Sequence, residues 1–160
     1  MTSHYQYHDS PLGELMLVSN GEAITGLCVT AGKYVPLVRP DWLHDRRLAV
    51  MTHARRELDA YFAGQLQTFS VALDPDGTDF QKLAWAALVR IPFGETRTYG
   101  QQACAMGRPR AVRAVGAANG KNPIGIIVPC HRVIGANGAL TGYAGGLANK
   151  ELLLKLEGIL

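Results

Sequence analysis

The sequence predicts a mixed α/β (α+β) protein in which a small antiparallel sheet with one helix precedes a mainly helical region. In the first third of the chain, apolar and polar residues alternate, which is typical of strands. Two helix-start signals of the capping-box type follow, at residues 78 and 98. The turn Asp74-Pro75-Asp76-Gly77 separates the two patterns. We therefore expect an N-terminal domain over residues 1–76 and a C-terminal domain over residues 77–160.

The N-terminal domain is predicted to contain a β-hairpin, a helix and a further short strand. Apolar residues recur over 12–17 and 24–29, on either side of Ser19-Asn20-Gly21. The Asn-Gly pair favours the tight turn of a hairpin. Apolar spacing over residues 46–63 predicts an amphipathic helix, and residues 69–73 alternate like a short strand.

The C-terminal domain is predicted to begin with three helices. Thr78-x-x-Gln81 and Thr98-x-x-Gln101 each place a threonine where its side chain accepts from a free backbone N–H, with a glutamine that reaches back. The helices that they open are expected to run to about residues 90 and 106. After a Gly-Arg-Pro break, a third helix is expected over residues 110–118. Two short helices around such a turn have the outline of a helix-turn-helix.

This third helix has one face of small and basic residues. At 100° per residue, Val112, Val115 and Gly116 are expected to face the core. Alanines on the outer face would let the helix backbone approach a partner closely. The outer face consists of Arg110, Arg113, Ala114 and Ala117. The pattern indicates a nucleic-acid reader, and an alanine-rich surface helix is the alternative.

Charge is distributed unevenly along the chain. The net charge is +3, but residues 1–80 carry six basic and ten acidic residues, whereas residues 81–135 carry eight basic residues and one acidic residue. Such a segment favours a polyanionic partner, although a solvated basic face fits the charge equally well.

No apolar run approaches the roughly 18 residues of a membrane span. We therefore expect no membrane association and a cytoplasmic location, at the nucleoid when in use.

The chain has three single cysteines: Cys28, Cys104 and Cys130. Their odd number and spacing indicate neither a disulfide framework nor a zinc site, and no metal or cofactor is expected. Cys130 differs from the others because it follows Pro129, at the end of an apolar run over 124–128 that we expect to be a buried strand. A thiol with its ordinary pKa needs a base, and His131 is the nearest imidazole. The local features leave open a catalytic and a purely structural cysteine.

The segment Pro129-Cys130-His131-Arg132-Val133 resembles the active-site signature of the O6-alkylguanine-DNA alkyltransferases, also called methylated-DNA–protein-cysteine methyltransferases. The resemblance covers residues 78–158 and keeps its spacing throughout. It includes Ile91-Pro92-Phe93-Gly94-Glu95, Thr98-Tyr99-Gly100-Gln101, Arg113-Ala114-Val115-Gly116, Asn122-Pro123 and Thr141-Gly142-Tyr143-Ala144-Gly145-Gly146. It implies DNA repair by direct reversal of damage, in which the alkyl group of O6-alkylguanine moves irreversibly, once per chain, to a cysteine of the protein. O4-alkylthymine is a second candidate substrate.

The same resemblance implies four catalytic residues. Cys130 corresponds to the nucleophile and permanent acceptor. His131 corresponds to a base that reaches the thiol through water, and Glu157 to the carboxylate that orients it. Asn122 corresponds to an asparagine that ties the recognition helix to the active-site segment.

The resemblance also implies contacts with the substrate. Tyr99 corresponds to the tyrosine that helps rotate the target nucleotide out of the stack, and Arg113 to the arginine that fills the gap. The second helix of the motif enters the minor groove in this family, which suits the bare surface around Ala114. The remaining candidate contacts are Arg132, Val133, Tyr143 and Ala144. At Ala144 and Ala136 this chain departs from hydroxyl side chains found in some members.

The implied partner is double-stranded DNA containing O6-alkylguanine, bound by a monomer, and cooperative binding along DNA remains open. Three other classes of protein fit the sequence less well. The first is a lesion-binding module of the same fold, which has no reactive cysteine, whereas this chain has Cys130. A transcription regulator would need a second DNA-binding domain, for which the chain is too short. A thiol hydrolase would leave the basic helix-turn-helix without a role.

Overall fold

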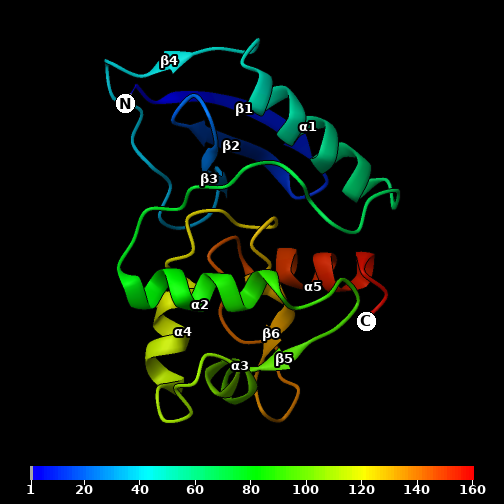
Figure 1. Ribbon diagram of the computed structural model, residues 1–160. Coiled ribbons are helices and arrows are strands. Elements are labelled where there is room, and N and C mark those ends of the chain that lie inside the picture. Colours follow the sequence, from blue (N-terminus) through cyan, green and yellow to red (C-terminus); the bar gives the residue numbers. More distant parts are fainter. Residues whose placement is uncertain (1) are drawn as a thin grey trace. The chain divides into compact units, whose positions relative to one another are not determined.

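The computed structural model describes residues 2–160, and Met1 lies outside the described part. The chain divides into two compact units, Met1–Asp76 and Gly77–Leu160 (Figure 1). A small sheet with a helix makes up the first unit, and helices predominate in the second. The predicted fold class is therefore confirmed.

The first unit is a four-stranded sheet with a helix, α1 (Ala49–Phe62), packed along it (Figure 1). The strands lie in the order β3-β2-β1-β4, with β1 and β2 antiparallel, β2 and β3 antiparallel, and β4 parallel to β1. Their bounds are His4–Ser10 for β1, Gly13–Ser19 for β2, Ile24–Val29 for β3 and Leu43–His44 for β4. The expected hairpin is the β2–β3 pair, and α1 provides Met51, Leu58 and Tyr61 to the core.

Strand β1 adds to the predicted hairpin. Its sequence is too polar to show an alternating apolar pattern, yet it pairs with β2 along its whole length. Gln6 within it is fully buried. Its side-chain amide is satisfied there, since it donates to the carbonyl oxygen of Asp45 at 3.3 Å and accepts from Arg55 at 2.6 Å. A satisfied polar side chain can thus occupy a core position of a strand.

The short strand expected over residues 69–73 is wrong. Only an isolated bridge between Leu73 and Ile24 forms there. The carboxylate of Glu57 on α1 accepts from the backbone N–H of Ser70 at 3.0 Å and of Val71 at 2.8 Å. A side chain thus satisfies the donors that a neighbouring strand would have taken.

The second unit contains four α-helices, one 3-10 turn and a pair of very short parallel strands. In chain order these are α2 (Asp79–Val89), β5 (Arg97–Thr98), α3 (Tyr99–Ala105), α4 (Val112–Gly120), η1 (Cys130–Arg132), β6 (Val133–Ile134) and α5 (Leu147–Leu156). Both expected capping boxes are present, at Thr78 and at Thr98. The helix predicted over residues 110–118 begins two residues later than expected, at Val112.

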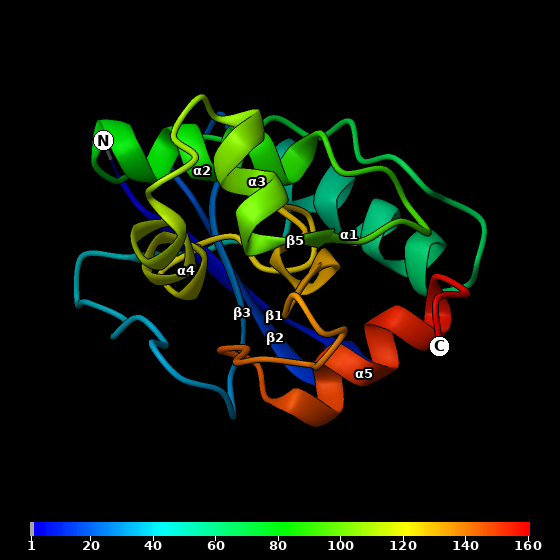
Figure 2. The ribbon, with the colours of Figure 1, turned by 90° about the horizontal axis from the view of Figure 1, so that it is seen from below.

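Helices α2, α3 and α4 pack through small side chains, and Figure 2 shows α3 beside α4. Their shared core consists of Ala84, Ala87, Ala103, Met106, Val115 and Ala118. Between α3 and α4 the buried amides of Gln102 and Asn119 hydrogen-bond each other reciprocally, at 2.9 and 2.8 Å. The indole of Trp85 donates to the carbonyl oxygen of Ala118 at 2.9 Å. These bonds fix the C-terminal end of α4.

Gly77, the first residue of the second unit, lies against the Trp85 ring. A Cβ atom at this position would stand 2.5 Å from Cη2 of Trp85 and 2.8 Å from Oε1 of Gln81. Real Cβ atoms do not approach other atoms so closely, so the packing at this end of α2 requires glycine.

Candidate active site

Cys130 lies on a tight turn. The buried segment 124–128 was expected to be a strand, and this expectation is wrong, because turns replace it. Ile126 has a φ of 71°, and the N–H of Ile127 donates to Gly125 at 2.8 Å. The N–H of Cys130 then donates to the carbonyl of Val128 at 2.8 Å. Short-range hydrogen bonds therefore hold the backbone that presents the thiol, where strand pairing was expected.

The pKa of the Cys130 thiol is raised above its ordinary value, chiefly because burial disfavours the charged thiolate. A hydrogen bond from the Asn122 side chain, the positive charge of Lys150 and the backbone N–H of Cys130 itself act in the opposite direction. Because burial dominates, the group is a thiol at neutral pH. Its proton must be removed for the sulfur to act as a nucleophile.

His131 and Glu157 form a buried pair. Nε2 of His131 lies 2.6 Å from Oε2 of Glu157, and neither side chain is exposed to solvent. Since a carboxylate only accepts hydrogen bonds, the contact assigns the ring proton to Nε2. The other ring nitrogen, Nδ1, is then an unprotonated acceptor, and it is buried without a hydrogen-bond partner in the described part of the chain.

The pKa of His131 is lowered, first by burial and further by the charges of Arg132 and Lys150, while Glu157 opposes the shift through its hydrogen bond and its charge. The imidazole is therefore neutral at physiological pH and available as a base. A free Nδ1 on a neutral ring, held by a carboxylate on its other side, can accept a proton from a nucleophile that lies within its reach.

Arg132 was expected to contact DNA or substrate, and the structure corrects this. Its side chain is buried, with Nε donating to Oε1 of Glu157 at 2.8 Å and Nη1 donating to the carbonyl of Ile91 at 2.7 Å. The N–H of Gly94 also donates to Glu157, at 3.2 Å. Arg132 thus neutralises and positions the carboxylate that holds His131.

Asn122 connects the end of α4 to the thiol. Its amide donates to the carbonyl of Val128 at 2.8 Å, and its Oδ1 accepts from the N–H of Ile124 at 3.0 Å. The same side chain opposes the rise in the pKa of Cys130. One residue therefore stabilises the turn and favours the thiolate.

Lys150 on α5 belongs to the site and was not singled out from the sequence. Its side chain is fully buried, and its ammonium donates to the carbonyls of Val133 at 2.7 Å and Thr141 at 2.9 Å. Burial lowers the pKa of Lys150, whereas the nearby Cys130 raises it. A possible sequence signal was the position of this lysine, three residues after Leu147 and three before Leu153, on the apolar face of a helix.

Four residues that were expected to contact the substrate are fully or partly buried. Burial, together with Cys130, raises the pKa of Tyr143 well above its ordinary value, so its phenol stays neutral and can donate a hydrogen bond. Val133 is buried and Ala144 is half-buried. Tyr99, the first residue of α3, is half-buried, with its hydroxyl 2.7 Å from Oγ1 of Thr141.

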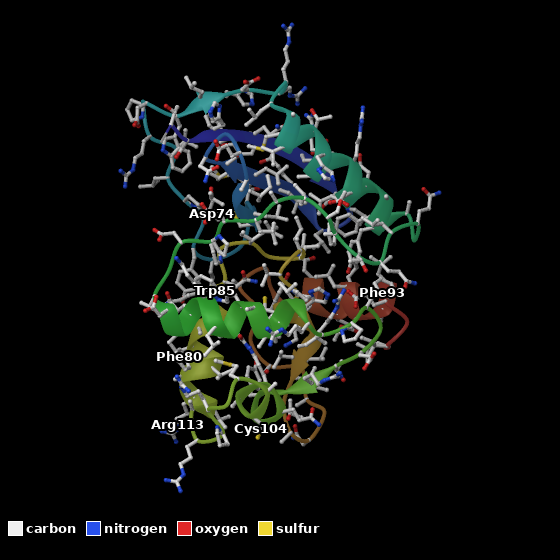
Figure 3. The ribbon with its side chains drawn as sticks, viewed as in Figure 1. Asp74, Phe80, Trp85, Phe93, Cys104 and Arg113 are labelled. Atoms are coloured by element: carbon white, nitrogen blue, oxygen red, sulfur yellow. The ribbon has the colours of Figure 1, made fainter. Side chains whose placement is uncertain are left out.

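The expected DNA-contacting face of α4 is open. Arg113 and Ala114 are both exposed, and in Figure 3 Arg113 lies on α4 at the outer edge of its unit. Val115 is buried as predicted, but Val112 was wrongly placed in the core, since it is 39% exposed at the first turn of the helix. Gly116 lies next to Tyr99, because a Cβ atom there would stand 3.8 Å from the tyrosine ring.

Across residues 2–160, no three His, Cys, Asp or Glu side chains are grouped so that they could hold a metal ion. Within the same residues, every helix is too short or too polar to cross a membrane.

Comparison with known proteins matches both units. The model of the 6-O-methylguanine DNA methyltransferase DNA-binding domain matches residues 79–159, and that of the ribonuclease-like domain of the same enzyme matches residues 3–75. The methylated-DNA–protein-cysteine methyltransferase of Methanosarcina barkeri is 50% identical over 154 residues, 96% of either chain. That of Mycobacterium tuberculosis is 53% identical over 96% of this chain and 92% of its own.

Solved structures agree with these matches. The M. tuberculosis O6-methylguanine methyltransferase has a TM-score of 0.89 and 52% identity, over 98% of this chain and 93% of the other. The M. tuberculosis OGT in complex with DNA has the same TM-score of 0.89, with 51% identity over 96% of this chain and 92% of the other.

Proposed function

The chain belongs to the 6-O-methylguanine DNA methyltransferase family, and from this membership we propose which of its residues carry out the reaction. The protein is a methylated-DNA–protein-cysteine methyltransferase that repairs DNA by transferring an alkyl group to one of its own cysteines. We propose Cys130 as the acceptor. The carrying observation is the buried contact of 2.6 Å between His131 and Glu157 beside this thiol.

The proposed chemistry is a displacement at the alkyl carbon. The thiol proton of Cys130 passes to Nδ1 of His131 through a water molecule, while Glu157 and Arg132 hold the ring. The sulfur forms a bond to the alkyl carbon as the bond from that carbon to O6 of guanine breaks. The departing guanine takes up one proton, so the sum is a thiol and an O6-alkylguanine giving a thioether and guanine. A thioether has no leaving group at hand for return, and each chain reacts once.

Access to O6 requires the nucleotide to leave the stack. Inside a duplex the attacking sulfur cannot line up with the alkyl carbon, so the base must rotate into the protein. The exposed face of α4, with Arg113 and Ala114, supports the proposal that this helix enters the minor groove and that Arg113 fills the gap. Tyr99 is proposed to donate a hydrogen bond from its hydroxyl to the flipped base.

We propose double-stranded DNA containing O6-alkylguanine as the substrate, with O4-alkylthymine as a second one, bound by one copy of the chain. All proposed catalytic and base-contacting residues come from residues 77–160, the proposed DNA-binding and alkyl-acceptor domain, which supports a monomer. Because the substrate is genomic DNA and the acceptor must remain a free thiol, we propose that the protein acts in the cytoplasm.

The acceptor is tested by intact-protein mass spectrometry. Wild-type protein is incubated with excess duplex DNA containing one O6-methylguanine, and a single methyl group is expected on each chain, mapped to Cys130. Cys130→Ser should gain nothing. Cys104→Ser, which changes an exposed cysteine on α3, is the matched control and should react like the wild type. Methylation at another residue, or of the Cys130→Ser protein, would overturn the assignment.

A further inference from the structure

Tyr99 is fixed in the structure by a residue far along the chain. Its hydroxyl lies 2.7 Å from Oγ1 of Thr141, and the two residues are 42 positions apart. Both are half-buried. A tyrosine hydroxyl without such a partner changes position whenever the side chain changes its χ1 rotamer. The contact with Thr141 gives it one position.

Thr141 is in turn held in place through its backbone carbonyl. Its carbonyl accepts from the buried ammonium of Lys150 at 2.9 Å, and the same ammonium donates to the carbonyl of Val133 at 2.7 Å. Val133 pairs with Arg97 in the β5–β6 ladder, and β5 ends at the residue before Tyr99. The contacts therefore form a closed circuit from Tyr99 through Thr141, Lys150 and Val133 back to Tyr99.

We propose that Thr141 is a positioning residue for the alkyl transfer, which holds the Tyr99 hydroxyl where it meets the flipped base, with Lys150 fixing Thr141. The inference rests on the proposed role of Tyr99 as a hydrogen-bond donor. When the threonine hydroxyl donates to the phenol oxygen, the phenolic proton stays free for the base. Accepting a hydrogen bond also polarises the phenol and makes it a stronger donor.

The test uses two substitutions at Thr141 and one at Tyr99. Thr141→Val keeps the shape of the side chain and removes the hydroxyl, whereas Thr141→Ser keeps the hydroxyl. The rate of methyl transfer from duplex O6-methylguanine to Cys130 is measured by mass. Thr141→Val is expected to lower this rate roughly five- to tenfold, the size of one hydrogen bond, and Thr141→Ser to stay within about twofold of the wild type.

The decisive readout is the dependence of this effect on Tyr99. In a Tyr99→Phe background, Thr141→Val should cause no further loss, because its partner hydroxyl is already absent. A loss of the same size in both backgrounds would mean that Thr141 acts through the fold, and a wild-type rate for Thr141→Val would also overturn the proposal. If Thr141→Val fails to fold, as judged by thermal unfolding, Thr141→Ala is tested in both backgrounds in its place.

Failure of this inference can be told apart from failure of the proposed function. A slow Tyr99→Phe protein with an unaffected Thr141→Val protein overturns the positioning role alone. A Tyr99→Phe protein that reacts at the wild-type rate removes the role of Tyr99 and, with it, this inference. Wild-type protein that gains no methyl group on Cys130 overturns the proposed function itself.

Discussion

The buried catalytic cluster and the exposed face of α4 are built in opposite ways. The side chain of Glu157 is fully buried and accepts from His131, Arg132 and the backbone of Gly94. Arg113 and Ala114 on α4 are exposed. Proton transfer from a thiol gains from groups that are already oriented in a low-dielectric site, because no solvent must rearrange during the reaction. A surface that receives DNA must instead remain open and uncrowded.

The largest effect should come from breaking the buried cluster. Glu157→Gln places an amide N–H₂ among groups that need an acceptor, and leaves Arg132 buried without its counter-charge. We expect the transfer rate to fall by about 10²–10³-fold and the free energy of unfolding to fall by about 3 kcal/mol. Kinetics by mass spectrometry and chemical denaturation measure the two effects.

Glu151→Gln is the matched control for this substitution. Glu151 lies on α5, the helix whose C-cap residue is Glu157, and it is exposed and pairs with Lys155 at 3.2 Å. Exposed pairs of this kind contribute little to stability, so rate and stability should both stay near the wild type. Similar losses of rate and stability in both variants would mean that the buried cluster is no more sensitive to loss of a charge than the surface is.

Breaking the exposed face should affect only the reaction on DNA. Arg113→Ala is expected to slow repair of duplex DNA by about 10–100-fold and to reduce the salt dependence of binding by about one ion. Its reaction with free O6-benzylguanine, which needs no nucleotide rotation, should stay unchanged. Arg56→Ala, an exposed arginine in the first unit, is the control. An equal loss on both substrates would assign Arg113 to the pocket or the fold.

The pH dependence of stability sharpens the comparison because, of the two regions compared, only the buried cluster contains a histidine. The pKa of His131 is lowered in the folded protein, so the unfolded chain binds a proton first as the pH falls. The free energy of unfolding should therefore decrease below about pH 6.5, by up to about 1.4 kcal/mol per pH unit, and level off below the folded pKa. Subtracting the pH profile of His131→Asn removes the contribution of the other histidines. A difference profile that is flat between pH 4 and 7 would contradict the buried, neutral imidazole.

The smallest effect is expected from adding bulk to α4. Ala114→Leu should slow duplex repair by about three- to tenfold, because the side chain lifts the helix from the groove, and should change stability by less than about 0.5 kcal/mol. Ala86→Leu, at an exposed position of α2, is the size-matched control and should leave repair unchanged. If Ala114→Leu repairs duplex DNA as fast as the wild type, close approach of this face is not required.

The sequence predicted those parts of the molecule that depend on local signals. The boxes at Thr78 and Thr98 were foreseen because a cap is formed by residues three apart. The chain could not reveal that Glu57 would replace a strand partner for Ser70 and Val71, since these residues are more than ten positions apart. Segment 124–128 is apolar enough for a strand, and nothing in its composition indicates the positive φ of Ile126.

The residues of the candidate site also differ in how far the sequence indicated their roles. Local features pointed to Cys130 and His131. Asn122 and Glu157 were identified only through a family signature, which encodes long-range proximity that spacing alone does not. The same resemblance led us to expect Arg132 among the substrate or DNA contacts, although the structure buries it against Glu157. The burial of Lys150 could not be predicted, since a lysine is ordinarily exposed, and only its partners, the carbonyls of Val133 and Thr141, explain it.

The close packing of Gly77 on Trp85 has a consequence for how the chain tolerates variation. A single methyl group at residue 77 would displace the indole, and this indole holds the carbonyl of Ala118 at the end of α4. The added methyl group would also displace Gln81 from the cap of α2. In a scan of all single substitutions for repair in cells, position 77 should be as intolerant as the residues around the thiol. Such a result would show that the first residue of the second unit is under selective constraint, although it contacts neither the thiol nor the expected DNA face.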